Sequence, residues 1–245
     1  TIVGAALYDF TADDGIRHTV WHVPDPVRYV HAFRDVPYLY IADGHHRAAS
    51  ASRARNELKD QSFGHTGDEE YNFFLTVIFP DEQLQILPYN RVVTELNGLS
   101  KDDFLARVTK SFQIVENAEP LPERREQWGM YLDGRWYGLS LPPGEAKPQG
   151  TVANLDVNII QERLLGPILG IRDVRTDKRI DFVGGKRGTA ELQRLVDEGK
   201  AVVAFSLYPT TIDDLLRVSD AGEVMPPKST WFEPKLRDGL LIHTI

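Results

Sequence analysis

The stretch YLYIADGHHRAAS, residues 38–50, is the starting point for predicting the fold. Its apolar start predicts a strand that stops at Asp43 and Gly44. The alanine-rich residues after Arg47 predict a helix, since no helix breaker occurs before Gly64. Two histidines and an arginine therefore stand where a strand passes into a helix. The first amides of a helix lack intrahelical partners and its dipole attracts negative charge, so the motif predicts an anion site.

The residues of this motif suit phosphate. Gly44 lets a ligand oxygen approach the backbone, Arg47 can fork onto two phosphate oxygens, and a histidine adds a further donor. Asp43 could hold Mg²⁺ or take a proton from an attacking hydroxyl. The alternative is that Asp43 caps the helix, the histidines are half-buried donors and Arg47 is solvated. Zinc is disfavoured, because metalloprotease spacing places two histidines four residues apart.

Composition excludes several classes of protein. The 245 residues are 42% hydrophobic and 26% charged, as in ordinary globular proteins. The net charge of −8 argues against a DNA partner, and the lack of cysteine excludes thiol nucleophiles, thiolate zinc sites and disulfides. No apolar run approaches the roughly 20 residues of a membrane helix, and no signal peptide is evident. We expect a cytoplasmic protein that binds small molecules and no membrane. The chain opens without Met, which predicts that the protein's beginning lies outside this sequence.

Working outward from the motif, the periodicity predicts an α+β (mixed α/β) fold without internal repeats. Predicted strands around the motif are residues 18–23, 37–43, 71–80 and 83–93, and predicted helices are 25–36, 46–59 and 100–112. The run 71–80 is apolar enough for a strand buried on both faces. Asp133-Gly134 between two apolar runs predicts a β-hairpin. Strand and helix runs then alternate to the C-terminus.

The polar, proline-bearing residues 116–125 suggest a boundary. We therefore expect a phosphate-binding part over residues 1–115 that contains the DGHHR motif. A C-terminal α/β part over residues 126–245 would pack on it. Alternatively, the two parts form a single domain overall.

DFVGGKRGTAEL, residues 181–192, is again strand, glycine turn and helix. Gly184, Gly185, Lys186 and Arg187 are candidates for a second anion site, although the P-loop pattern is absent. A tight turn with a solvated basic tip explains the same residues.

MPPKSTWFEPK, residues 225–235, is stiffened by proline and offers donors to an anion from Lys228, Ser229 and Lys235. Trp231 could stack on a base, or pack as core or lid.

LPYNRVV, residues 87–93, places Arg91 between apolar runs, where a guanidinium must find a partner. An intramolecular carboxylate is the default expectation, and a ligand is the alternative.

Taken together, IADGHHRAAS, LPYNRVV, LDV, LGI, RIDFVGG and MPPKSTWFEPKLRDGL resemble the DUF1015 family over nearly the whole chain. That family label brings no activity with it. The family's usual N-terminal portion, with its own proline-rich opening, is not in this sequence.

More distantly, the strand, Asp-Gly-His-His-Arg and helix resemble the ParB/sulfiredoxin-like superfamily, which includes free-serine kinases. The resemblance implies that the strand-loop-helix core binds nucleotide phosphates. His46 and Arg47 match the superfamily's phosphate binders, and His45 stands at the position of the sulfiredoxin thiol, which makes it a catalytic candidate beside Asp43. The lack of cysteine excludes sulfiredoxin chemistry, and the acidic charge disfavours ParB-like DNA binding.

We therefore expect a phosphotransferase that uses ATP or ADP with Mg²⁺ and a small hydroxylated acceptor, such as serine. Phosphoryl transfer needs positioning and charge neutralisation more than covalent chemistry from the protein, which suits these residues. A regulatory module that binds nucleotide or another anion without turnover, and a phosphohydrolase, remain alternatives.

Overall fold

The structure is a computed structural model that describes residues 4–145 and 148–245. Its contacts divide the described chain into two compact units. Unit 1 contains the residues up to Ile78 and the C-terminal segment Lys235–Ile245, and unit 2 contains Phe79–Pro234. The mixed α/β class predicted from sequence is confirmed in unit 2, which holds the sheet and the core. Among the described residues, no helix has both the length and the apolar content that crossing a bilayer requires.

Unit 2 is built on a six-stranded sheet in which every neighbouring pair is antiparallel. In spatial order the strands are β5 (Gln113–Glu116), β7 (Arg135–Ser140), β6 (Gln127–Leu132), β9 (Val203–Leu207), β4 (Tyr89–Val93) and β8 (Ile180–Gly184). The predicted boundary at 116–125 is therefore not where the structure divides, because β4 and β5 complete the sheet formed by the later strands. Residues 79–115 belong with unit 2 instead of with the DGHHR motif.

The hairpin between β6 and β7 is confirmed. Leu132 pairs with Arg135, so the loop consists of Asp133 and Gly134. Both loop residues have positive φ, 51° and 76°, as a type I′ turn requires. A two-residue turn of this type fixes the register of both strands.

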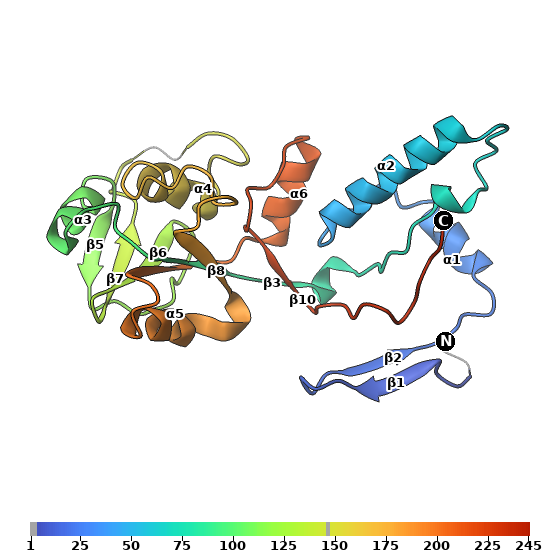
Figure 1. Cartoon of the computed structure of the whole chain (residues 1–245), viewed down its shortest axis with the longest axis horizontal. Helices are drawn as coiled ribbons and strands as arrows, with labels where there is room; N and C mark the ends of the chain where they lie inside the picture. The colour runs from blue at the N-terminus through green and yellow to red at the C-terminus, as the bar shows by residue number, and fades with distance from the viewer. Residues whose placement is uncertain (1–3, 146–147) are drawn as a thin grey trace. The chain divides into compact units, whose positions relative to one another are not determined.

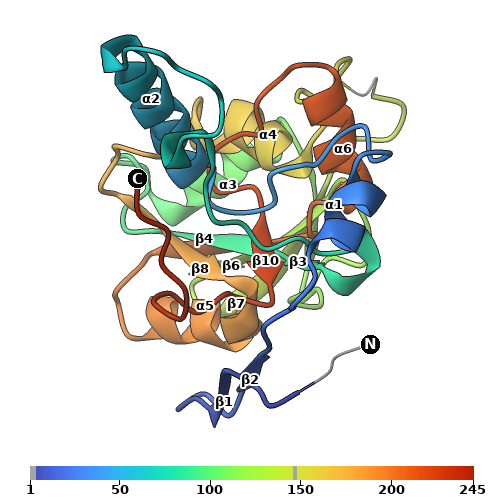
Figure 2. The same cartoon turned by 90° about the vertical axis from the view of Figure 1, so that its right-hand side faces the viewer.

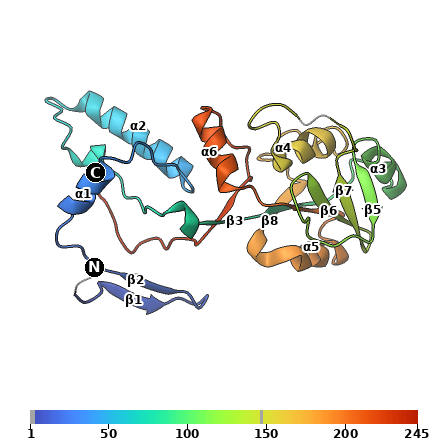
Figure 3. The same cartoon turned by 180° about the vertical axis from the view of Figure 1, so that it is seen from behind.

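Helices cover both faces of the sheet (Figures 1 and 2). The helices of unit 2 are α3 (Lys101–Val108), α4 (Asp156–Ile160, continued by a π turn over Gln161–Leu165), α5 (Gly188–Asp197) and α6 (Ile212–Asp220). The main core gathers Phe104 of α3, Ile160 of α4 and Val218 of α6 against one face. Leu192 of α5 lies in a smaller cluster on the other face, and Figure 3 shows α5 opposite α4.

Short elements complete unit 2. A 3₁₀ turn over Asp81–Gln83 precedes β3 (Gln85–Leu87), which pairs antiparallel with β10 (Trp231–Glu233). Another 3₁₀ turn, Gly185–Arg187, joins β8 to α5. Two helices begin with a side-chain cap: the Ser100 hydroxyl accepts the Asp103 amide at the start of α3, and Thr211 forms a full capping box at α6.

Unit 1 contains a hairpin of β1 (Tyr8–Thr11) and β2 (Arg17–Val20), helix α1 (Val27–Phe33), helix α2 (His45–Gln61) and a 3₁₀ turn over Glu70–Asn72. The long helix predicted after the motif is confirmed. Neither α1 nor α2 buries a residue. Every buried hydrophobic side chain of the described residues belongs to unit 2.

Two predicted strands are not observed in unit 1. Residues 37–42 and 73–80 join no hydrogen-bonded ladder, and large side chains in both runs are exposed, such as Tyr38 at 76% and Phe74 at 55%. The apolar residues of α1 are also exposed. An apolar run predicts that a segment can be a strand, but the ladder needs a partner strand that the run itself cannot specify.

A buried carboxyl group lies where α4 begins. Asp156 is 8% exposed, and both of its oxygens accept the Glu126 amide at 3.0 Å. Burial raises the pKa of Asp156 to about 7, although the Glu126 N–H and the charge of Arg125 act in the opposite direction. The neighbouring charges of Glu126 and Asp214 add to the increase. This carboxyl therefore costs stability at neutral pH.

We predict that Asp156→Asn removes part of the pH dependence of stability. As the pH rises from about 4 to about 7, the unfolded carboxyl loses its proton and the folded one retains it, so the free energy of unfolding falls. A shift of about three pKa units corresponds to a loss of up to about 4 kcal/mol. Denaturant unfolding of wild type and Asp156→Asn at several pH values, followed by tryptophan fluorescence, should show a flatter curve for the variant and greater stability at pH about 8.

The control is Asp213→Asn, which changes an exposed carboxyl on α6. Its curve should run parallel to wild type. Parallel curves for Asp156→Asn as well would contradict a raised pKa at this position.

Candidate functional site

The backbone of the DGHHR motif leaves the start of α2 without a side-chain cap. Gly44 is the N-cap residue in the left-handed conformation, with φ 84° and ψ 24°. The first intrahelical bond joins the Ala48 amide to the Gly44 carbonyl, so the amides of His45, His46 and Arg47 precede it. The Asp43 carboxylate accepts the amide of Gly44 at 2.8 Å instead of capping the helix. The amides of this 17-residue helix are thus placed to bind an anion.

The arginine of the motif folds back over its glycine. A Cβ atom on Gly44 would lie 3.4 Å from Arg47 Nε, so the position needs glycine both for its positive φ and for this close approach. Arg47 donates from NH1 to the Asp238 carboxylate at 3.1 Å, and the two side chains are 74% and 91% exposed. Such an exposed pair is screened by water, so an incoming anion could take the place of Asp238.

Both histidines are exposed rather than half-buried, with ring centroids 4.1 Å apart. The alternative interpretation of the motif expected Asp43 as a cap, half-buried histidine donors and a solvated Arg47. The structure shows neither the cap nor half-buried histidines, but Arg47 is exposed as that interpretation expected. Among the described residues, no group of three or more His, Asp or Glu side chains could hold a metal ion.

Lys235, which the sequence predicted as a donor to an anion, contacts this motif. Its ammonium donates to the Asp43 carboxylate at 2.8 Å. Burial alone would raise the pKa of Asp43, but the hydrogen bonds from Lys235 and Gly44, with the charges of Lys235 and Arg47, outweigh it and hold the pKa below its usual range. Asp43 is therefore ionised at neutral pH. We call Asp43–Arg47 with Lys235 and Asp238 the DGHHR cradle.

Lys228 and Ser229 belong to unit 2 and are held by contacts there. The Ser229 hydroxyl donates to the Pro226 carbonyl, and the residue is 4% exposed. The Lys228 ammonium lies 5.4 Å from the ring centroid of Tyr89 and 5.9 Å from that of Phe182. These contacts give both residues a structural role in unit 2, and their contact with a nucleotide stays a prediction.

Packing explains the glycine pair of the predicted second anion site. A Cβ atom on Gly184 would lie 2.5 Å from the Trp231 ring, and one on Gly185 would lie 2.7 Å from Pro88 Cδ. Lys186 and Arg187 follow in the 3₁₀ turn before α5. The pair is thus required by the approach of neighbouring segments, and anion binding by the two cations stays a prediction.

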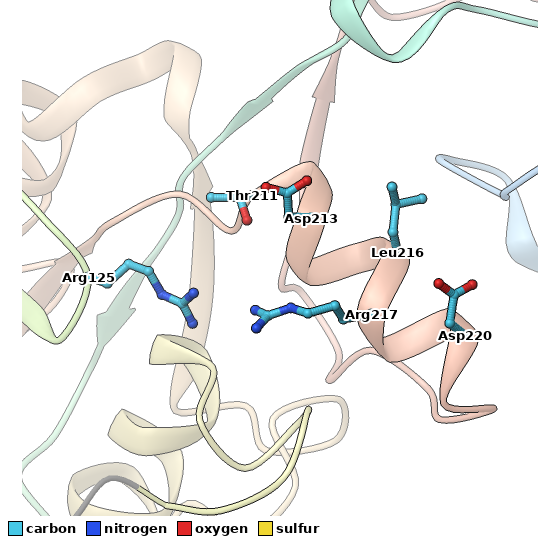
Figure 4. Close-up of a pocket in the computed structure, with 6 residues that line it drawn as sticks. All are labelled: Arg125, Thr211, Asp213, Leu216, Arg217 and Asp220. Carbon is cyan, nitrogen blue, oxygen red and sulfur yellow. The ribbon is translucent and has the colours of Figure 1, made fainter.

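Sequence reasoning did not identify an open depression of about 540 Å³ beside α6 (Figure 4). Arg125, Asp213, Arg217 and Asp220 are among the residues that line it. The two arginines pair with the buried Asp214 carboxylate, which is 3% exposed. These two ion pairs compensate the buried Asp214 charge at the start of α6. The sequence showed Arg125 only as part of a polar loop, with no sign of its partner.

The default expectation for Arg91, an ion pair with a carboxylate of the same chain, is wrong. Arg91 is 2% exposed, yet no carboxylate of the described residues pairs with it. Its NH1 group donates to the Tyr89 carbonyl at 2.7 Å.

The chain belongs to the DUF1015 family, described as a protein of unknown function, because the family model matches residues 2–158. No curated protein matches it. Among solved structures, a free serine kinase in complex with AMP is similar at 12% identity and a TM-score of 0.42, covering 84% of this chain and 78% of that chain. A mutant of the free serine kinase with AMP has 15% identity and a TM-score of 0.38, over 62% of this chain and 55% of that chain.

A conserved hypothetical protein from Pyrococcus furiosus has 13% identity and a TM-score of 0.40, over 84% of this chain and 81% of that chain. The chain thus spans little more than half the length of the mutant kinase.

The glycine pair after β8 allows a test of the packing explanation. We predict that Gly184→Ala lowers the free energy of unfolding by about 1–3 kcal/mol, because the new methyl group overlaps the Trp231 ring. Denaturant unfolding of Gly184→Ala, Trp231→Ala and the double variant measures the coupling. In the Trp231→Ala background the Gly184→Ala change should cost clearly less. An equal cost in both backgrounds would show that the ring is not the cause.

Proposed function

We propose that this protein binds a nucleoside di- or triphosphate at the DGHHR cradle and transfers a phosphoryl group to the hydroxyl of a small metabolite, such as an amino acid like serine. The observation that carries the proposal is the start of α2. A left-handed glycine leads into an uncapped helix whose first amides, His46 and Arg47 occupy one turn. Amides, a guanidinium and a helix dipole together are suited to phosphate oxygens.

Each residue of the cradle then has a role. The amides at the start of α2 and the Arg47 guanidinium would neutralise phosphate charge, with His46 as a further donor. Lys235 lies 2.8 Å from Asp43 and would reach the same phosphates by leaving its carboxylate partner. Phosphoryl transfer depends mainly on this kind of positioning and charge stabilisation.

Asp43 is the candidate to orient the acceptor hydroxyl and receive its proton. Because its pKa is held low, the group is ionised and can accept a hydrogen bond, while proton transfer to it would come late in the reaction. His45 is the first residue of α2 and is exposed, and it is the second candidate for the base.

The cradle offers one carboxylate, Asp43, that fits Mg²⁺ as a ligand. Mg²⁺ in nucleotide sites is usually held by one or two carboxylates together with phosphate oxygens and water. Asp43 could be such a ligand, and the described residues provide no cage of protein ligands around it. When bound, the ion would supply charge neutralisation between the phosphates.

We predict that Arg47→Ala greatly weakens nucleotide binding and leaves the fold intact, since the side chain is 74% exposed. The test is isothermal titration calorimetry with ATP, ADP, CTP and GTP, each with Mg²⁺, supported by thermal shift. The matched control is Arg53→Ala, which removes another exposed arginine of α2. Nucleotide affinity should fall at least about tenfold in Arg47→Ala and stay at the wild-type value in Arg53→Ala.

Equal affinity of wild type and a folded Arg47→Ala variant would overturn the nucleotide assignment. Where binding is found, phosphorus NMR of the products separates the three alternatives. A phosphorylated metabolite indicates a kinase, free phosphate alone indicates a phosphohydrolase, and unchanged nucleotide indicates a regulatory module.

We also predict that Asp238→Asn tightens nucleotide binding by about two- to tenfold. Asp238 is the carboxylate that holds Arg47 at 3.1 Å, so it competes with phosphate for the guanidinium and repels the ligand. Titration of the variant with the nucleotide that binds wild type best measures the change. Weaker binding in Asp238→Asn would mean that Asp238 positions Arg47 instead of competing for it.

A further inference from the structure

Arg91 occupies a position where a hydrophobic residue would be expected. It lies in β4 between two strands, opposite Phe182 of β8 and Phe205 of β9. Because side chains alternate along a strand, Arg91 projects to the same face as Val93, which belongs to the main core. A permanent charge is therefore set into the apolar face of the central sheet.

The hydrogen bonds of this guanidinium are incomplete. Arg91 Nη1 donates to the Tyr89 carbonyl at 2.7 Å, and Arg91 Nη2 is 3.5 Å from the Lys228 carbonyl. Nε is buried and has no hydrogen-bond partner among the described residues. Burial lowers the pKa of Arg91 to about 10, which leaves it charged at neutral pH. A buried charge without a counter-ion is costly unless something else provides one.

Arg91 lines an open pocket of about 570 Å³ within unit 2, called the cavity below. Much of the wall is apolar, including Val157, Val174, Met225 and Pro226, and Arg172 adds an exposed positive charge. A volume of this size fits a small organic molecule.

The carboxylate in the cavity wall does not neutralise Arg91. Asp173 accepts two hydrogen bonds from the Arg175 guanidinium and one from the Arg175 amide, each at 3.0 Å, so its charge is already paired. A second residue of the wall, Gln161, also has an unsatisfied atom: its Nε2 donates to the Ile171 carbonyl at 2.8 Å, and its buried Oε1 accepts no hydrogen bond from the part of the chain that the structure describes.

We infer that this cavity binds an oxyanion, carboxylate or phosphate, carried on a small apolar body. The edge of a guanidinium formed by Nε and Nη2 can donate to two oxygens of such a group. In Arg91 this edge has only the 3.5 Å contact of Nη2 with a carbonyl among the described residues. The apolar wall would hold the body of the ligand, and Gln161 Oε1 would accept from a ligand hydroxyl or amine. The inference concerns unit 2 alone and does not depend on the DGHHR cradle.

The test titrates the full chain with isocaproate, with isoamyl phosphate and with isocaproamide, which has the same apolar body without the charge. Calorimetry should detect binding of at least one of the two anions and none of the amide. In Arg91→Met, which keeps the volume and removes the charge, the affinity should fall at least about tenfold. Arg107→Gln, which changes an exposed arginine of α3, is the control and should bind as wild type does.

The two anions distinguish the source of the oxygens, since binding of isocaproate alone identifies a carboxylate and binding of isoamyl phosphate alone a phosphate. Arg91→Lys is a second variant in case Arg91→Met does not fold. It keeps the charge and loses the two-pronged contact, so its affinity should also be reduced. Failure of folded wild type to bind either anion, or undiminished binding by a folded Arg91 variant, would overturn the inference.

Discussion

The pairing of β4 with β8 on one side and β9 on the other is the interaction on which unit 2 depends. It joins segments distant in sequence into a sheet that both layers of helices need as a surface. Asn90 extends this pairing beyond the backbone, because its Oδ1 accepts the amide of Leu207 at 3.1 Å. The same strand also sets the problem of Arg91, since the alternation that places Val93 in the core places a guanidinium beside it.

Features that depend on nearby residues could be predicted from the sequence. The Asp133-Gly134 hairpin, the caps at Ser100 and Thr211 and the helix after the DGHHR motif all rest on interactions within a few positions of the chain. Features that depend on distant partners could not. The apolar runs at 37–43 and 71–80 carry no information about a partner strand, and the polar loop at 116–125 conceals that the strands before and after it share one sheet.

The candidate site also combines features set by nearby residues with contacts from distant ones. The helix start after Gly44 is local, and the motif predicts that its first amides lack intrahelical partners. The contacts that complete the cradle, from Lys235 to Asp43 and from Asp238 to Arg47, come from the other end of the chain. Lys235 was predicted because its own segment, residues 225–235, offers donors to an anion. Asp238 was not predicted, because the sequence of the DGHHR motif does not indicate which carboxylate contacts it.

The two cation sites differ in what their charges cost. In the DGHHR cradle, Arg47 and Lys235 are exposed and their ion pairs contribute at most about 1 kcal/mol each, so exchange of a carboxylate for a phosphate needs little reorganisation. Arg91 is buried and none of the described residues provides a counter-ion, so an anion that reaches it would gain from a desolvated charge and relieve a cost already present in the fold. Exposure therefore suits the cradle to a ligand that binds and leaves, whereas burial suits Arg91 to the selective recognition of one charged group.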